Sequence, residues 1–212
     1  MSQEKPPRRS RWKNRSNTSI LLIMPFVASC LTACDLTVAD APNNQPYVPK
    51  VAEFLPLSGG QGDAKYSSDG TKTDYQLKTI TQGNKTSFQA VSHDVVVDEE
   101  VYEVKDNTVF LSSAVGENFQ PPIPLLKSPS RIGDKYDWKG QLVCNDLRID
   151  GSASVTSSID YVATKGKSQD AIKVEVNLEL GKGASRKLSF WFVKGMGVLK
   201  TEMGKNVREP KE

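Results

Sequence analysis

Residue types that could carry out catalysis are scarce in this sequence of 212 residues. The single histidine, His93, is followed by Asp94, whereas a Ser–His–Asp triad needs the acid to orient the base beside a nucleophile. Neighbouring side chains of a strand point to opposite faces, so these two residues cannot act together within one. We expect His93 at a turn or a sheet edge, and we expect no catalytic residue and no enzyme activity.

Metal and cofactor sites are not indicated either. Zinc sites use three or four His, Cys, Asp or Glu ligands with recognisable spacing, and no such spacing stands out here. The acidic run Asp98-Glu99-Glu100 alternates across a strand, so it predicts a solvated edge that blocks unwanted strand pairing rather than a calcium loop. A glycosidase-type pair stays open, because any two of the 25 acidic residues could meet in the fold.

The first 33 residues have the three parts of a secretory signal. Six basic residues and one acid lie within the first 15 positions, and an apolar run of 14 residues extends from Ile20 to Ala33. A helix of that length reaches about 21 Å, too short for a hydrocarbon core of about 30 Å. We therefore predict a signal peptide over residues 1–33.

The end of that segment, Leu31-Thr32-Ala33-Cys34, resembles the lipobox of bacterial lipoproteins. The resemblance implies cleavage before Cys34, a diacylglyceryl group on its sulfur, and usually an acyl chain such as palmitate on the new amino terminus. The protein would then be lipid-anchored in the cell envelope, facing the periplasm without spanning the membrane. Asp35 favours the inner membrane in lipoproteins of the enteric type. The alternatives are a simple secretory signal with an unremarkable cysteine and a short anchor that stays uncut.

The remaining cysteine and the charge balance exclude further classes. Cys30 would leave with the signal, so Cys144 would have no partner for a disulfide; its apolar neighbours predict a buried, inert thiol, with a reactive thiol as the alternative. After residue 33 the chain holds 22 basic and 24 acidic residues. This near-neutral balance predicts no nucleic-acid partner.

The mature chain reads as a tether followed by a sheet. Residues 34–50 are the lipidated cysteine and a stretch with three prolines and no apolar periodicity, which predicts a flexible tether. Residues 51–207 carry the pattern of a β domain, and residues 208–212 are expected to be a disordered tail. From Ile172 to Leu180 apolar and polar residues alternate strictly, as in a strand with one wet face.

Strand candidates recur about every ten residues, with turn residues between them. We expect strands at 75–82, 86–92, 95–104, 108–115, 141–149, 153–163, 172–180, 187–193 and 197–202, and a short helix at 125–130 or 168–171. The prediction is an all-β or β-dominated fold, with one curved antiparallel meandering sheet or an incomplete barrel. Leu178, Leu180, Phe190 and Phe192 are the candidate apolar face, which either lines a binding hollow or fills a closed core.

Three segments resemble poorly characterised bacterial envelope lipoproteins: residues 133–140 (GDKYDWKG), 165–174 (KGKSQDAIKV) and 189–200 (SFWFVKGMGVLK). Such proteins are similar in architecture to the Lol lipoprotein carriers. The resemblance implies an incomplete antiparallel barrel around an apolar hollow. It brings no catalytic residue and no cofactor.

These features lead to three hypotheses on function. The favoured one is a membrane-tethered, non-enzymatic domain that binds an apolar ligand such as a lipid, or an envelope protein. The second is a structural or assembly subunit of an envelope complex. The third, with least support, is an envelope hydrolase.

Overall fold

The computed structural model describes residues 46–54, 61–68, 71–164 and 166–210. The chain divides into two compact units, Met1–Pro42 and Asn43–Glu212, and all described residues belong to the second. The predicted signal peptide with its motif Leu31-Thr32-Ala33, the predicted lipidation site Cys34 and the predicted tether up to residue 45 lie outside the described residues.

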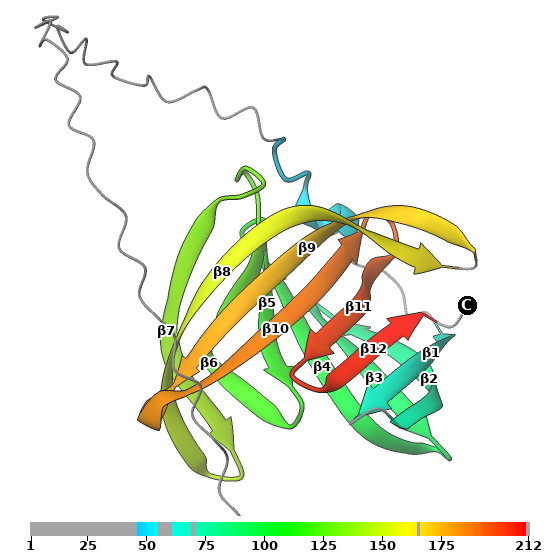
Figure 1. The fold of residues 1–212 in the computed structure, drawn as a ribbon, viewed down its shortest axis with the longest axis horizontal. Coiled ribbons are helices and arrows are strands. Elements are labelled where there is room, and N and C mark those ends of the chain that lie inside the picture. Colours follow the sequence, from blue (N-terminus) through cyan, green and yellow to red (C-terminus); the bar gives the residue numbers. More distant parts are fainter. Residues whose placement is uncertain (1–45, 55–60, 69–70, 165, 211–212) are drawn as a thin grey trace, which may run out of the picture. The chain divides into compact units, whose positions relative to one another are not determined.

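The described residues form a single antiparallel sheet in which every strand pairs with the next one along the chain (Figure 1). The strands are β1 Gln61–Ser68, β2 Thr71–Gln82, β3 Lys85–Ser92, β4 Val95–Lys105, β5 Thr108–Ala114, β6 Glu117–Lys127, β7 Lys135–Cys144, β8 Leu147–Thr164, β9 Lys167–Leu180, β10 Ala184–Val193, β11 Gly197–Met203 and β12 Asn206–Pro210. Two short 3-10 turns, η1 Val51–Phe54 and η2 Gly181–Gly183, are the helical elements among them. The predicted all-β class with one curved, meandering sheet is confirmed.

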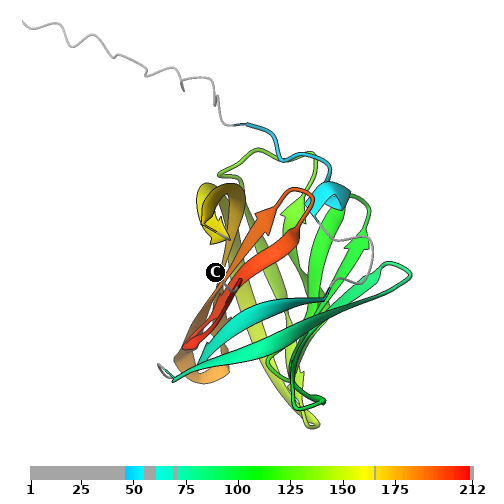
Figure 2. The same cartoon turned by 90° about the vertical axis from the view of Figure 1, so that its right-hand side faces the viewer.

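The sheet curls until its first strand, β1, pairs with its last strand, β12 (Figure 2). β1 pairs with β12 over four register positions and β11 with β12 over three, whereas β8 and β9 pair over fourteen. The ring of strands is therefore complete, but few backbone pairs hold its closing part. The curved sheet of the prediction is therefore closed by only a few backbone pairs.

Among the residues that the structure describes, four two-residue turns with positive φ at both positions connect neighbouring strands. Three of them carry residue types that adopt this conformation readily: His93-Asp94, Asp106-Asn107 and Asn145-Asp146. The expected turn position of His93 is thus confirmed. The fourth turn, between β5 and β6, places the β-branched Val115 at φ 51° before Gly116 at φ 73°. Such a residue adopts this region only at an energetic cost.

Backbone pairing is also short between β6 and β7, where only Asn118 to Gln120 of β6 are paired with β7. Beyond it, Pro121, Pro122 and Pro124 offer no amide hydrogen, and strands tolerate proline where a neighbour is not hydrogen-bonded. Side chains bridge the gap: Trp138 Nε1 donates to the Pro121 carbonyl at 2.9 Å, and the Tyr136 hydroxyl donates to the Leu125 carbonyl. The prolines concealed β6 from the sequence pattern.

Three local predictions are wrong. The segment 125–130 is the end of β6 and a bend, and 168–171 belongs to β9, so neither is a helix. The strand expected at 141–149 is two strands joined by the turn Asn145-Asp146. Cys144, at the end of β7, is partly exposed rather than buried.

The last residues of the predicted tether, 46–50, are part of the β domain. The Val48 amide donates to the Ser130 carbonyl and the Ile132 amide to the Pro46 carbonyl, both at 2.9 Å, and Val48 is buried. Residues 46–50 therefore belong to the domain, because their backbone is paired and an apolar side chain is packed there.

Candidate binding groove beside strand β4

The four residues of the predicted apolar face lie in the interior of the curled sheet. Leu178 and Leu180 of β9 are 1% and 8% exposed, and Phe190 and Phe192 of β10 are 0% exposed. They belong to one continuous cluster with residues from β3 to β11, including Tyr102, Leu111 and Ile123.

This interior is filled by side chains. A side chain with no accessible surface borders no space as large as a water molecule, and that holds for Phe190, Phe192, Leu111 and Ile123. A lipid chain therefore finds no room beside them in this conformation. In this structure the predicted apolar face packs in the hydrophobic core and does not line a binding hollow.

A buried polar network interrupts the apolar interior. The carboxylate of Glu100 on β4 accepts hydrogen bonds from Arg208 Nη2 (2.7 Å, to Oε2) and Nε (3.2 Å, to Oε1), from Thr201 Oγ1 (2.9 Å) and from the Tyr102 hydroxyl (2.7 Å). Glu100 and Arg208 are 3% and 5% exposed. Two predictions are corrected here: Glu100 is not part of a solvated edge, and residues 208–210 are strand β12 rather than a disordered tail.

The network shifts the ionisation of its members. Burial lowers the pKa of Arg208, but the charge of Glu100 and its hydrogen bonds outweigh this and hold that pKa above its ordinary value. Burial, and then the negative charge of Glu100, raise the pKa of Tyr102 well above its usual range. Arg208 therefore stays charged and Tyr102 stays a neutral donor at neutral pH.

N-terminal to Val101, the edge of β4 that faces β5 is no longer paired with it. The pairing between β4 and β5 ends at Val101↔Ser113, with Ser112 as an extra residue on β5, and the chain then turns at Val115. From Val95 to Glu100, β4 continues for six residues and, among the described residues, pairs with β3 alone.

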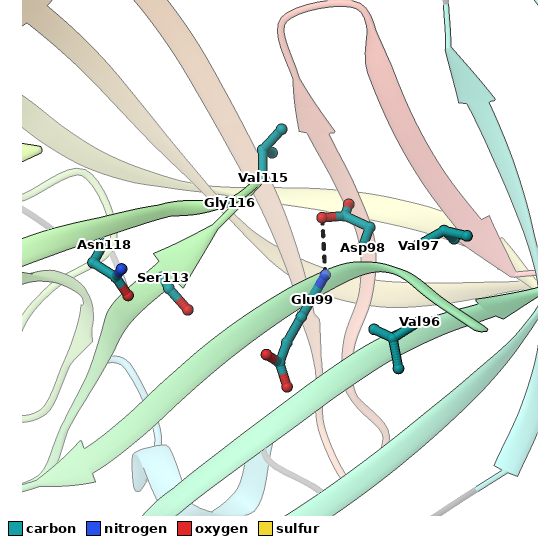
Figure 3. Close-up of a pocket in the computed structure, with 8 residues that line it drawn as sticks. All are labelled: Val96, Val97, Asp98, Glu99, Ser113, Val115, Gly116 and Asn118. Atoms are coloured by element: carbon teal, nitrogen blue, oxygen red, sulfur yellow. Dashed lines mark hydrogen bonds between the residues drawn. The ribbon is translucent and has the colours of Figure 1, made fainter. Parts of the chain in front are cut away.

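A groove of about 530 Å³ follows this unpaired edge (Figure 3). Its lining residues are Val96, Val97, Asp98, Glu99, Ser113, Val115, Gly116 and Asn118. The consecutive residues Val96 to Glu99 of β4 all take part, and a bulge at Val97 interrupts the regular alternation of their side chains. The groove therefore runs along the edge of β4 rather than across either face.

The walls of the groove combine apolar surface with one half-buried acid. Val95, Val96 and Val97 are 61%, 47% and 50% exposed, and Val115 at the hairpin tip is 40% exposed. Desolvation, and then the charge of Glu100, raise the pKa of Asp98. The groove thus holds a carboxyl group whose ionisation is disfavoured by its surroundings.

The two acids of the groove face different ways, as Figure 3 shows. Glu99 accepts hydrogen bonds from Ser87 and from Gln89 Nε2 (2.8 Å) on the neighbouring strand β3. Asp98 Oδ1 instead accepts the backbone amide of Glu99 at 2.9 Å. A side chain thus satisfies a main-chain donor in the stretch where β5 is no longer paired with β4.

Sequence reasoning placed β4 correctly but did not identify the groove. The available signal was the run Val95-Val96-Val97, which breaks the alternation expected of a half-buried strand. The point at which β5 turns away depends on a bulge and a strained turn, and neither has a sequence pattern.

Other site types are not supported in the part of the chain that the structure describes. That part holds no group of three or more His, Cys, Asp or Glu residues that could bind a metal ion. Within the same residues, no helix has the length and apolar character needed to cross a membrane.

A comparison with protein-family models and one with curated proteins give no match for this chain. Three solved structures are similar to it at low identity. A candidate lipoprotein of Parabacteroides distasonis is 10% identical, with 74% of this chain and 95% of that chain covered and a TM-score of 0.47. A candidate exported protein of Bacteroides fragilis with a YmcC-like fold is 13% identical (74% and 96% covered, TM-score 0.44), and the hypothetical lipoprotein YmcC of Escherichia coli is 8% identical (69% and 82% covered, TM-score 0.39). Likeness at this level carries no conclusion about function.

Proposed function

We propose that this protein is a lipid-anchored bacterial envelope lipoprotein whose β domain binds a partner protein at the groove beside β4, without catalysing a reaction. The lipid anchor rests on the sequence Leu31-Thr32-Ala33-Cys34 after a basic segment and a short apolar run. The binding role rests on one observation, the unpaired and valine-rich edge of β4 along a groove of about 530 Å³.

A protein partner fits better than an apolar ligand held in a hollow. The interior beside Phe190 and Phe192 is filled, whereas the exposed residues Val96 and Val97 of β4 line one groove together with Val115. Contiguous exposed apolar surface of this kind marks interaction sites. Asp35 favours the inner membrane, with the domain facing the periplasm.

A structural or assembly subunit of an envelope complex is the second candidate, because a stable subunit would use the same exposed edge. The two differ in the permanence of the contact. A subunit would co-purify with its complex through mild detergent extraction, whereas a binding protein would separate from its partner on dilution.

The anchor is tested on the full chain produced in bacterial cells. Intact-mass spectrometry of the membrane-extracted protein is expected to show loss of residues 1–33 and addition of lipid, and Cys34→Ala is expected to abolish both. Retention of residues 1–33 by the unaltered chain, or its partitioning into buffer rather than detergent, would overturn the anchor.

The binding role is tested by photo-crosslinking in cells, with a photoreactive amino acid at Val97. The matched control is the same substitution at Ile159 on β8, which is 51% exposed. One dominant crosslinked protein is expected from position 97 and not from position 159. Equal or absent crosslinking at the two positions would contradict the proposal.

A further inference from the structure

We propose that the β4 groove takes an extended segment of the partner protein as an added strand, paired with Val95–Glu100, with apolar side chains against the valines and a lysine or arginine beside Asp98. This inference rests on the proposed function and names the chemistry of its partner.

The backbone of β4 supplies the first argument. Between Val95 and Glu100, one edge pairs with β3, with a bulge at Val97, and the other edge has no strand partner among the described residues and borders the groove. Strand edges present unpaired amide and carbonyl groups that recruit extended peptides. Six residues span about 20 Å, which matches a short added strand.

The side chains supply the second argument. An added strand places alternate side chains on the two faces of the sheet. Val96 and Val97 of β4 are both exposed, and Figure 3 shows them on opposite sides of the strand. A segment with apolar residues on both faces would cover them. Val115 and Gly116 at the hairpin tip border the same groove, so they would contact the incoming segment.

The charge supplies the third argument and decides between occupants. Asp98 is half-buried beside Glu100, and desolvation raises its pKa, so a cation placed next to it would be favoured. A second copy of this chain, paired antiparallel about this stretch, would instead bring two Asp98 carboxyl groups together. Like charges directly opposite each other destabilise strand pairs. The groove therefore favours a basic, apolar segment of another protein.

The test uses the full lipidated protein in detergent micelles and a defined peptide. The probe has nine residues with blocked ends, in which valine alternates with threonine around a central lysine. Two control peptides carry glutamate in place of lysine, or N-methyl groups on the amides of one edge. Binding is followed by NMR shifts and hydrogen exchange of the amides of residues 95–100.

The lysine peptide is expected to shift these amides and to slow exchange of those facing the groove. The glutamate peptide is expected to bind up to about fivefold more weakly, the upper end of the range for a favourable cross-strand charge pair. The N-methylated peptide is expected not to bind. Asp98→Asn is expected to remove the preference for lysine, while Ile159→Thr on β8 leaves all three affinities unchanged.

Equal binding of the lysine and glutamate peptides, binding of the N-methylated peptide, or unchanged exchange at 95–100 would overturn strand addition. Concentration-dependent self-association that protects the same amides would also overturn it, in favour of a second copy. A dominant crosslink at Val97 together with unchanged exchange would leave the proposed function standing and reject only this mode of binding.

Discussion

Arg208 Nη2 lies 2.7 Å from Oε2 of Glu100, and this buried ion pair joins the strand that closes the sheet to the strand that borders the groove. β12 has few backbone pairs with its neighbours, so the side-chain contact adds a connection where the ladder is thin. Thr201 and Tyr102 donate the further hydrogen bonds that a buried carboxylate requires.

Removing one partner of this pair is expected to destabilise the domain strongly. Glu100→Gln leaves the Arg208 guanidinium buried without a counter-charge, and such a loss costs about 3–5 kcal/mol. The free energy of unfolding in urea measures it. The double variant Glu100→Gln, Arg208→Met is expected to recover part of the loss, because no unpaired buried charge remains. A change below about 0.5 kcal/mol in the single variant would show that the pair is not important for closure.

Asp98 is expected to make the free energy of unfolding fall as the pH rises. Its pKa in the folded protein is raised above the ordinary value of 3.8, so the folded state binds the proton more tightly than the unfolded state. The resulting stability is full below pH 3.8 and is lost as the pH rises through the raised pKa.

Asp98→Asn is therefore expected to stabilise the free protein at pH 7 relative to the unaltered chain, and this difference is expected to shrink towards pH 4. Chemical unfolding of both proteins at several pH values measures the difference. A variant that is less stable at pH 7 would contradict the assignment. Greater stability combined with weaker peptide binding is the pattern expected of a group kept for binding.

Val115 is also expected to lower stability while supporting peptide binding, in this case because of its backbone conformation. Its φ of 51° is unfavourable for a β-branched residue, and asparagine is preferred at this turn position. Val115→Asn is expected to raise the free energy of unfolding by about 1 kcal/mol and to weaken binding of the lysine peptide. Asp106→Asn, in a turn of the same type that already holds a favourable residue, is the control and should change stability little. A destabilised Val115→Asn protein would contradict the strained turn.

Gly140 is expected to be required where β6 and β7 separate. A Cβ there would lie 2.5 Å from the Gln120 carbonyl oxygen and 2.5 Å from Cζ2 of Trp138. Gly140→Ala is expected to cost about 1–3 kcal/mol, because backbone or a packed ring must move. At Gly181 an added Cβ has its nearest neighbour at 3.7 Å, so Gly181→Ala is the control with a small effect. Equal thermal stability of the two variants would show that this seam can relax.

The sequence predicted the elements whose side chains follow a simple period. The alternation from Ile172 to Leu180 predicted β9 because one face packs and the other is wet. β6 could not be predicted in this way, since its three prolines resemble a loop and are tolerated only where β7 departs. Arg208 was placed in a tail because its partner, Glu100, is distant in sequence, and no local pattern marks that pairing.

The candidate site also depends on contacts between residues that are distant in sequence. The alternating pattern predicts that Leu178 and Phe190 share an apolar face, but only the packing shows that they are buried in the interior. The groove exists because β5 ends before β4 does, which is a property of strand register. Register between strands is set by bulges and turns as well as by composition.

Amide hydrogen exchange of residues 95–100, measured on the lipidated protein in native membranes and again after purification in detergent, tests the central claim most directly. The groove-facing amides of β4 are expected to exchange slowly in membranes, where the partner strand covers them, and quickly once the protein is purified alone. Exchange at the same fast rate in both preparations would contradict a partner at this edge, and equally slow exchange in both would show that the edge is not open.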